Sequence, residues 1–410
     1  MDFGYMNQNI DLRDKVKTFI KENLTQEVKD ELEASERTEN ISHVEIEGSE
    51  GKALREFLGK IRDNGWQGIS WPKKYGGQDG SRLDQYIVEE EFGRIGISAG
   101  GAGGTAAAIM AAGTEEQKNY FIPGIINGDI NFCQGFTEPS GGADLASLQC
   151  RAVVDGDDFI VNGQKIYTSG AHAATHVYLM VRTDPEAPKH RGISILLVPM
   201  DTPGITIRPL YSIQNDPPAP MGTTYGHKKT NETFYENVRV PKSALLGEMN
   251  MGWYVGAMGL NLDRVGASRY LLSVRRDEDI INWMKNNNLG EYDIKENETI
   301  RDKTAEMWIE AQVCRLMTMR SMSIVEHGGN FSYEGSAEKV WAPEHGVRAT
   351  EAYVQMLGPY GQLLNTSANT IDSGIFAHNL LGAFQSGINH GSVQIMRDQV
   401  GRRGLGLPRG

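Results

Sequence analysis

The hydrophobic and polar positions of this chain change their period twice. Up to about residue 127, apolar residues recur at helical spacing, as in LRDKVKTFIKENL and ALREFLGKIRDNGW. Apolar residues three and four positions apart form one face of an amphipathic helix, so this part predicts helices. The segment WPKKYGG, with Pro72, Gly76 and Gly77, predicts a loop between these helices and the next one.

From about Ile130 to Leu246 the helical period disappears. RAVVDGDDFIVNG predicts a hairpin that turns at Asp155 and Gly156. The apolar runs HVYLMVRT, GISILLVPM, GITIRPL and TFYENVRVP predict further strands. We therefore expect a small, mostly antiparallel β domain.

From Trp253 onward the helical period returns, first in YVGAMGLNLDRV. IRDKTAEMWIEAQVCRLMTMRSMSIV predicts one long amphipathic helix, and HGVRATEAYVQML predicts another. The expected fold class is α+β, with an N-terminal helical domain, a central antiparallel β domain and a C-terminal helical domain. The predicted domain boundaries are 1–129, 130–246 and 247–410.

Composition narrows the possible partners. The net charge is -12 and no long basic run offsets it, which argues against nucleic acid or an anionic membrane as the main partner. The N-terminus lacks an apolar signal core, and no apolar run reaches about 18 residues, so we expect a cytoplasmic protein without membrane insertion. Cys133, Cys150 and Cys314 show no CxxC spacing, so neither a disulfide framework nor a metal site is expected.

The stretch GFTEPSGGADL places three glycines and a proline beside Thr137 and Glu138, directly after an apolar strand-like run. Glycine lets the backbone pass close to a ligand, and backbone N–H groups in such a loop can bind acceptor atoms. An ordinary surface turn is the alternative. A second polar segment, NGQKIYTSGA, follows further along the chain.

That second segment offers groups for a planar ligand. Tyr167 has a ring for stacking, while Thr168 and Ser169 have hydroxyls and backbone donors. Neither segment is a GxGxxG after a strand or a GxxxxGKS, so a Rossmann site or a phosphate loop is not supported. The two segments together fit the edge of a flavin better than a nucleotide phosphate.

Seven segments spread over nearly the whole chain resemble the acyl-CoA dehydrogenase family. In order they are GWQGISWPKKYGG, GTEEQKNYFIPGIINGD, TEPSGGADL, NGQKIYTSG, NVRVP, QMLGPYG and RRGLGLPR. The resemblance implies a C-terminal four-helix bundle, a homotetramer and one FAD per subunit. It also implies α,β-dehydrogenation of an acyl-CoA thioester, in which a hydride passes from the β-carbon to flavin N5, a carboxylate removes the α-proton, and the electrons pass to an electron-transfer flavoprotein.

The resemblance also implies site residues. Residues 134 to 143 would form the loop that faces flavin and CoA, with Thr137 donating toward the isoalloxazine ring. The implied cofactor contacts are Gln134, Phe136, Thr137, Gly142, Ala143, Tyr167, Thr168, Ser169, Gln355, Gly358, Ser392 and Gln394. The implied substrate contacts are Ala143, Asn261 and Arg264.

The chain departs from the family's sequence pattern in two respects. Ala143 stands where the family commonly has a serine that bonds the CoA arm, and NNNLGEYDIKEN lacks the family's arginine-phenylalanine FAD motif. Two alternatives therefore stay open. The chain is a non-catalytic partner subunit of a heteromeric acyl-CoA dehydrogenase, or a flavoenzyme of the same fold with changed chemistry, such as enoyl-CoA reduction, desulfination or oxygenation.

The catalytic base is a further departure. Removal of the weakly acidic α-proton needs a carboxylate in a dry site, where its pKa can rise toward neutrality. Many relatives have a glutamate near the C-terminus, where INHGSVQ here places His390. In another branch the glutamate precedes an arginine on the first helix of the bundle, where GLNLDRVG here places Asp263. Burial makes a carboxylate a stronger base and an imidazole a weaker one, so we expect Asp263 to be the base, with His390 as the alternative. A third alternative is that the chain retains no base.

The segment GISAGGAGGTAAAIMAAG, residues 96 to 113, consists almost wholly of small residues. In the family this helical region borders the acyl cavity. The small residues either permit close helix packing or leave room for a branched or cyclic acyl group, and the sequence leaves both open.

Overall fold

The computed structural model describes residues 7–37, 51–99, 103–210, 230–262, 266–287, 294–329, 332–364, 367, 369–371, 374–389 and 391–408. The N-terminal part is helical, as expected. Its helices are α1 (Asn7–Asn23), α2 (Gln26–Arg37), α3 (Lys52–Asp63), α4 (Arg82–Arg94), α5 (Gly103–Ala112) and α6 (Glu115–Asn127).

Local sequence signals fix where these helices begin and end. Ser81 and Asp84 form a reciprocal capping box at the start of α4, and Thr114 and Gln117 form another at the start of α6. Helix α6 ends at Gly128, whose φ of 77° is the left-handed conformation that favours glycine. The buried faces of α1, α3 and α4 meet in one apolar cluster that includes Val16, Phe57, Ile61 and Phe92.

The central domain is a seven-stranded sheet with the order β1-β4-β2-β3-β7-β6, and β5 pairs with β4. The predicted hairpin is confirmed, because β2 and β3 pair antiparallel on either side of Gly156. Strand β1 runs parallel to β4, and most other pairs are antiparallel. The strands are β1 (Phe132–Gly135), β2 (Arg151–Asp155), β3 (Asp158–Lys165), β4 (His176–Arg182), β5 (Ile193–Pro199), β6 (Ile205–Pro209) and β7 (Asn231–Pro241).

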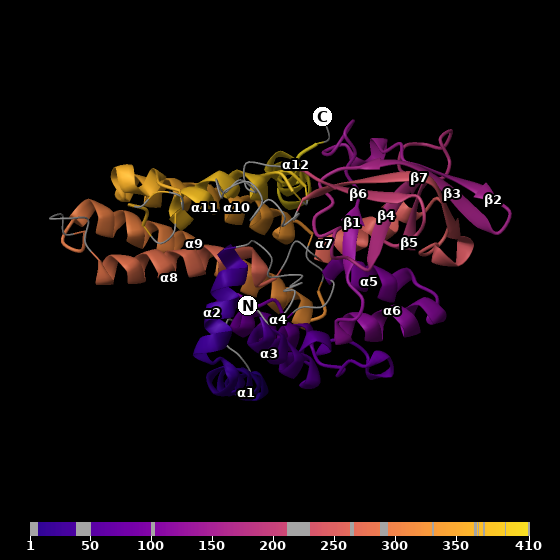
Figure 1. The fold of residues 1–410 in the computed structure, drawn as a ribbon. Coiled ribbons are helices and arrows are strands. Elements are labelled where there is room, and N and C mark those ends of the chain that lie inside the picture. Colours follow the sequence, from indigo (N-terminus) through magenta and orange to yellow (C-terminus); the bar gives the residue numbers. More distant parts are fainter. Residues whose placement is uncertain are drawn as a thin grey trace.

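Both faces of β4 and β5 are buried, which explains their continuous apolar runs. On one face, Tyr178, Met180 and Ile195 pack against Ile109 of α5 and Ile122 of α6 in a single cluster. Alternate residues such as Val177 and Leu179 belong to a second cluster on the other face. In Figure 1 the helices α5 and α6 lie beside the sheet, between it and the other N-terminal helices.

The C-terminal part returns to helices, as the periodicity indicates. They are α7 (Gly252–Leu262), α8 (Ser268–Asn286), α9 (Glu298–Glu326), α10 (Glu334–Met356), α11 (Ile375–Ala383) and α12 (Val393–Gln399). The prediction of one long helix is confirmed by the 29-residue α9. Helices α8, α9, α10 and α11 form an elongated bundle that extends away from the sheet (Figure 1).

Small residues let α7 approach its neighbours closely. A Cβ at Gly259 would lie 2.7 Å from the carbonyl oxygen of Gly104 in α5, and one at Gly252 would lie 2.6 Å from the backbone of Ser194 in β5. At Gly104 the small-residue segment therefore serves close helix packing. Room for a bulky acyl group elsewhere in that segment stays a prediction.

A buried carboxylate joins the N-terminal helices to the bundle. Glu90 of α4 accepts from Arg315 of α9 at 2.7 Å and from the Tyr270 hydroxyl of α8 at 2.7 Å, and it also pairs with Arg13 of α1. Burial alone would raise the pKa of Glu90, but these three partners outweigh it and lower that pKa to about 2. Along the described ranges no helix is both long and apolar enough to cross a membrane.

Candidate functional site

A buried ion pair fixes the glycine-rich loop of GFTEPSGGADL to the end of β3. The fully buried Lys165 donates from Nζ to Glu138 Oε1 at 2.8 Å and to the carbonyl oxygen of Phe136 at 3.0 Å. The Glu138 carboxylate also accepts from the backbone N–H groups of Gln149, at 2.6 Å, and Cys150, at 2.8 Å. Both carboxylate oxygens are therefore paired, and the loop is fixed at Glu138 both to the end of β3 and to the residues just before β2.

Burial sets the electrostatics of this pair. It lowers the pKa of Lys165, and the adjacent Glu138 carboxylate acts in the opposite direction. A buried charge pair is stable only when its remaining hydrogen-bonding positions are also filled, and here both Glu138 oxygens have partners while Lys165 has two acceptors. The sequence pointed to Glu138 as part of the loop but not to its partner, although Lys165 stands in the second segment, NGQKIYTSG.

The two predicted segments lie directly against each other. The backbone N–H of Ile166 donates to the carbonyl oxygen of Thr137 at 2.9 Å. The next residue, Tyr167, has a left-handed φ of 58° and 61% of its surface exposed. This conformation costs a residue with a side chain roughly 1 to 2 kcal/mol, so the surrounding contacts must impose it.

The three residues 167–169 differ in what they present. The Thr168 hydroxyl is fully buried, 3.3 Å from that of Thr233, and the Thr168 N–H donates to the carbonyl oxygen of Asn231 at 2.9 Å. Tyr167 and Ser169 are exposed. In this chain the Tyr167 ring and the Ser169 side chain are thus the parts of the segment that a ligand can reach.

The glycine-rich loop is partly exposed to solvent. Gly142 and Ala143 are exposed, while Gln134, Phe136 and Thr137 are half-buried. A Cβ at Gly142 would lie 3.3 Å from Thr137 Cγ2, so the backbone of Gly142 passes close over Thr137. The structure therefore brings the predicted cofactor contacts of the β domain together in one place.

Arg182 at the end of β4 ties this loop to the connection between β4 and β5. Its guanidinium donates to the carbonyl oxygens of Ala146 at 2.5 Å, Leu148 at 3.3 Å and Lys189 at 3.0 Å. The Lys189 ammonium also forms an ion pair with the exposed Asp144. The connection is thereby fixed against the glycine-rich loop.

This connection carries Lys189, His190 and Arg191, all of them exposed. The His190 ring lies 4.6 Å from the ring of Trp253 at the start of α7, centroid to centroid. The resulting basic surface adjoins Ala143 through Asp144. It was not predicted from the sequence, although three consecutive basic residue types in an acidic chain were a visible signal.

The predicted cofactor contacts of the bundle lie elsewhere. Gln355 and Gly358 are at the end of α10, where Thr304 Oγ1 of α9 is 3.7 Å from Met356 Sδ. Figure 1 shows this end of the bundle pointing away from the sheet. Within one chain, Gln355 and Gly358 are therefore not brought to the loops of the β domain.

Ser392 and Gln394 are at the opposite end of α10. The Ser392 hydroxyl accepts from the Ile395 N–H at 3.4 Å and caps α12, and Gln394 is exposed. Lys339 of α10 donates to the carbonyl oxygen of Ser386 and, at 3.2 Å, to Asn389 Oδ1. From Lys339 to Gln355 the helix rises about 24 Å, at 1.5 Å per residue. The two pairs of predicted contacts thus occupy different ends of the bundle.

Neither candidate for the base is placed by the structure. Asp263, Arg264 and His390 lie outside the described residues. Asn261 is described by its backbone alone, in the last turn of α7. Their roles stay predictions.

The described arrangement can bind a planar ring and an anionic group. It combines an exposed aromatic ring, a backbone loop held by a buried ion pair, and an adjoining basic surface. Among the residues whose placement is given, no group of three or more His, Cys, Asp or Glu side chains could hold a metal ion.

Comparison with known proteins covers the whole chain. Sequence profiles of the N-terminal, middle and C-terminal domains of acyl-CoA dehydrogenases match residues 7–129, 133–223 and 250–405. "Acyl-CoA dehydrogenase FadE26" of Mycobacterium tuberculosis is 32% identical, over 100% of this chain and 99% of that protein.

Two solved structures are similar over their full length. "Tcur3481-Tcur3483 steroid ACAD" has a TM-score of 0.82 and 30% identity, covering 100% of each chain. The "ChsE4-ChsE5 complex from Mycobacterium tuberculosis" has a TM-score of 0.80 and 30% identity, again covering 100% of each chain. Both structures carry the names of two proteins.

Proposed function

Because this chain belongs to the acyl-CoA dehydrogenase family and is an oxidoreductase acting on acyl-CoA, we propose that it binds FAD and catalyses α,β-dehydrogenation of an acyl-CoA thioester. One observation carries the proposal for this chain. The loop at 134–143 and the segment at 167–169 are held together by Lys165 and Glu138, with Tyr167 exposed beside them.

The residues present fit FAD. Thr137, Gly142 and Ser169 offer hydroxyl and backbone groups to the heteroatoms of the flavin, and the Tyr167 ring offers a stacking surface. The left-handed backbone of Tyr167 supports this role, because strained residues often occur at ligand-binding sites and the Tyr167 side chain is exposed. FAD, when bound, supplies the acceptor for the two electrons removed from the substrate.

The decisive experiment is purification with ample flavin. We expect a yellow protein with a flavin absorption band that is reduced by an acyl-CoA substrate under anaerobic conditions. A colourless protein that binds no FAD on titration would contradict the proposal. Rates with an artificial acceptor, measured in both directions, separate dehydrogenation from enoyl-CoA reduction.

We propose Asp263 as the base that takes the α-proton, with His390 as the alternative. The carboxylate must approach the α-carbon closely, because aspartate is one methylene shorter than the glutamate of the family. Asp263→Asn keeps the shape and removes the base, so flavin reduction should fall about a thousandfold or more while FAD and acyl-CoA still bind. His390→Ala should lose far less. The opposite pattern would assign the base to the INHGSVQ segment.

For the substrate we propose a bulky, cyclic acyl group of the steroid type. The support is the similarity to a structure named as a steroid ACAD, together with the small residues of 96–113. Lys189 and Arg191 beside the glycine-rich loop provide positive charge for the phosphates of CoA. A substrate panel tests this. Faster turnover of butyryl-CoA or octanoyl-CoA than of every cyclic or branched thioester would contradict it.

The split between the two sets of predicted contacts supports a multimeric enzyme. We propose a homotetramer in which the far end of one bundle, with Gln355 and Gly358, completes the loop site of another subunit. Electrons then pass to an electron-transfer flavoprotein in the cytoplasm.

A heteromeric assembly is the second candidate. Two observations favour it, namely the paired protein names of the similar structures and the missing arginine-phenylalanine motif. In that case this chain is a partner subunit without activity of its own. Activity of the purified chain alone supports the homotetramer, whereas activity that appears only on mixing with a related chain supports the heteromer.

A further inference from the structure

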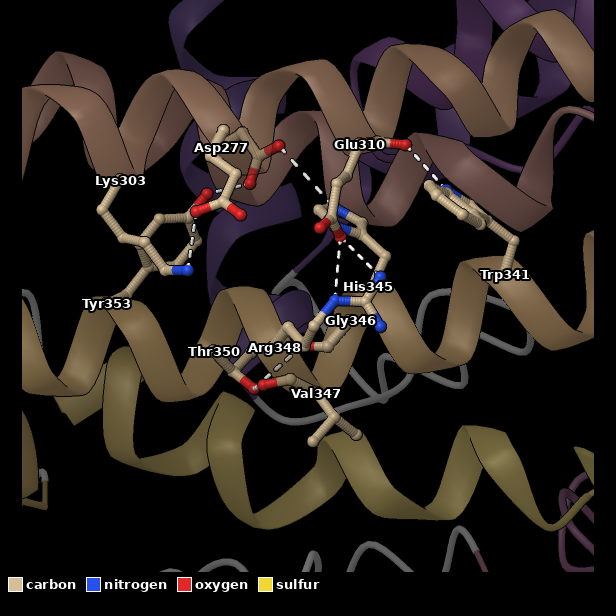
Figure 2. Close-up of polar contacts among 11 residues, drawn as sticks. Asp277, Lys303, Glu310, Trp341, His345, Gly346, Val347, Arg348, Thr350 and Tyr353 are labelled. Carbon is tan, nitrogen blue, oxygen red and sulfur yellow. Dashed lines mark hydrogen bonds and ion pairs between the residues drawn. The ribbon is translucent and has the colours of Figure 1, made fainter.

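A second buried polar cluster lies inside the C-terminal bundle, away from the loops of the β domain. Figure 2 shows it between α8, which carries Asp277, α9, which carries Glu310, and α10, which carries His345, Arg348 and Tyr353. Asp277 and His345 are both fully buried. The proposed reaction does not use this cluster, so a role for the cluster is independent of that reaction.

Most of the polar atoms in this cluster are paired. The Tyr353 hydroxyl donates to Asp277 Oδ1. Glu310 Oε2 lies 3.1 Å from His345 Nδ1 and accepts from Arg348 Nε at 3.0 Å and from Arg348 Nη2 at 2.6 Å. The main-chain oxygen of Glu310 accepts from Trp341 Nε1 at 2.9 Å. The cluster is thus a chain of contacts that crosses the bundle.

Two buried atoms in the middle of this chain of contacts have no hydrogen-bond partner. They are Asp277 Oδ2 and His345 Nε2, and they lie 3.9 Å apart. A buried polar atom without a partner costs about 1 to 3 kcal/mol. Asp277 Oδ2 and His345 Nε2 therefore lack a hydrogen between them that would let them bond to each other.

The number of N–H groups on the imidazole shows that one hydrogen is missing from these contacts. Neutral histidine has one N–H. If this proton is on Nδ1, it is donated to Glu310, and the lone pair of Nε2 faces the Asp277 carboxylate. If it is on Nε2, the lone pair of Nδ1 faces the Glu310 carboxylate. Either tautomer leaves one contact between two acceptors with no hydrogen.

We propose that Asp277, His345 and Glu310 form a buried site that binds one proton beyond those of a neutral histidine and two carboxylates. With this proton on Asp277, Oδ2 donates to His345 Nε2, and His345 Nδ1–H donates to Glu310. Tyr353 and Arg348 supply the donors at the two ends. An approach of about 1 Å brings Oδ2 and Nε2 within hydrogen-bonding distance.

The surrounding charges favour a proton at this place. Burial raises the pKa of Asp277 to about 7, Tyr353 and Arg276 oppose the rise, and Glu278 and Glu310 add to it. Burial lowers the pKa of His345, which keeps the imidazole neutral beside a protonated carboxyl.

Other charged groups of the packed helices are engaged elsewhere. Lys303 of α9 pairs with Glu306 at 2.7 Å. From α4, Arg94 faces Glu278 at 4.0 Å. Burial lowers the pKa of Arg276 to about 10, so it stays charged at neutral pH and weakens the proton site without abolishing it. The proton therefore belongs to the Asp277–His345 pair as a unit.

Occupancy of the site makes the contribution of Asp277 to the stability of the folded state depend on pH in one direction. In the unfolded chain the aspartate titrates near its ordinary pKa, about 3.9. Since the folded chain holds the proton more tightly, the stability is fully present below the unfolded pKa and is lost as the pH rises to the folded pKa. From pH 5 to pH 8 the Asp277 contribution alone raises the unfolding equilibrium constant about a hundredfold. The lowered pKa of His345 acts in the opposite direction, so the Asp277 contribution is measured relative to a variant that keeps His345.

Asp277→Asn tests the proposal because asparagine imitates the proton-bearing aspartate. Its amide nitrogen can donate to His345 Nε2, and its oxygen can accept from Tyr353. Chemical denaturation of the full chain is measured at several values from pH 5 to pH 8. We expect the unfolding constant of the wild type to rise about a hundredfold relative to the variant across this range. Parallel pH profiles of the two proteins would overturn the proposal.

The matched control is Glu278→Gln, which removes a charge from the adjacent position of α8. Glu278 has 41% of its side chain exposed, so water screens its contribution to the pKa of Asp277, and its change should shift the pH profile of the wild type only slightly. A profile altered equally by both variants would show a general charge effect and would also overturn the proposal.

A measurement on the wild type covers the case in which Asp277→Asn does not fold. Infrared difference spectra between pH 5 and pH 8 detect the carbonyl stretch of a buried, protonated carboxyl group. Because burial also raises the pKa of Glu89 to about 7, the spectra are compared with those of Glu89→Gln. We expect a band at pH 5 that disappears at pH 8, that remains in Glu89→Gln and that is absent from a folded variant of Asp277. No protonated carboxyl band in Glu89→Gln at pH 5 would contradict the site.

Discussion

Two of the buried ionic clusters among the described residues have opposite character. In the β domain, both carboxylate oxygens of Glu138 are paired with Lys165 and with backbone N–H groups. In the bundle, Asp277 Oδ2 and His345 Nε2 face each other at 3.9 Å without hydrogen-bond partners. The first cluster is complete with its charges in place, while the second needs another proton.

The difference shows how burial acts on charge. Removing ions from water is costly, and the cost is offset only where every remaining donor and acceptor is satisfied. Where the carboxylate oxygens are paired, as at Glu138, the ion pair can hold a loop in place. Where this pairing is not achieved, the group instead changes its protonation state, as we propose for Asp277.

The strongest way to break this comparison is Lys165→Met. It leaves the Glu138 charge buried without its cation, so the free energy of unfolding should fall by about 3 to 5 kcal/mol. Denaturant titration measures this loss. The double variant Glu138→Gln with Lys165→Met should lose less than the sum of the single variants, because neither charge is then left alone. A loss below about 1 kcal/mol in Lys165→Met would mean that the pair does not hold the loop.

A smaller effect is expected from Tyr353→Phe. The hydroxyl of Tyr353 favours the ionised carboxyl, so its loss raises the pKa of Asp277 further. The cost should therefore be about 1 to 3 kcal/mol at pH 8, where Asp277 is ionised, and clearly less at pH 5. Denaturation at both pH values measures it. Equal costs at the two values would argue against a proton on Asp277.

Tyr167→Gly should change stability only slightly, and in the favourable direction. Glycine adopts the φ of 58° without strain, so we expect a gain of up to about 1 kcal/mol. FAD affinity should fall, because the ring is lost. Tyr167→Ala is the control, since it removes the ring and keeps the strained backbone. Unchanged FAD affinity in both variants would remove Tyr167 from the cofactor site.

The smallest effect is expected at the exposed pair of Asp144 and Lys189. Their side chains are 59% and 48% exposed, so water and salt screen the attraction. Asp144→Asn should change the free energy of unfolding by less than about 0.5 kcal/mol. Denaturation at low and high salt measures it. If Asp144→Asn lowered the free energy of unfolding as much as Lys165→Met, burial would not explain the difference between the exposed and the buried ion pair.

Sequence periodicity predicted much of this fold because it records which side of an element is buried. The apolar pattern follows burial in several elements, namely the hairpin of β2 and β3, the strands β4 and β5, and the long helix α9. The loops at 134–143 and 167–169 were found from their glycines and polar residues, and the structure places them side by side.

Polar contacts between residues far apart in the sequence do not show in its local pattern. Asp277 stands in RRDEDI, which has the composition of an exposed helical face, yet it is fully buried against two other helices. Lys165 and Glu138 are 27 positions apart, and nothing local indicates that they meet. The predicted domain boundaries, the cofactor contacts and the choice between Asp263 and His390 stay predictions.

The shared carboxylate at Glu90 has a consequence for how the protein unfolds. Glu90 and Tyr86 of α4 both bond the Tyr270 hydroxyl of α8, and Arg315 of α9 also reaches Glu90. Separating the N-terminal helices from the bundle would deprive Tyr270 and Arg315 of their acceptor and deprive the Glu90 carboxylate of these two donors. The N-terminal domain and the bundle should therefore melt in a single cooperative calorimetric transition, and a fragment cut between them should not keep the native packing of either side.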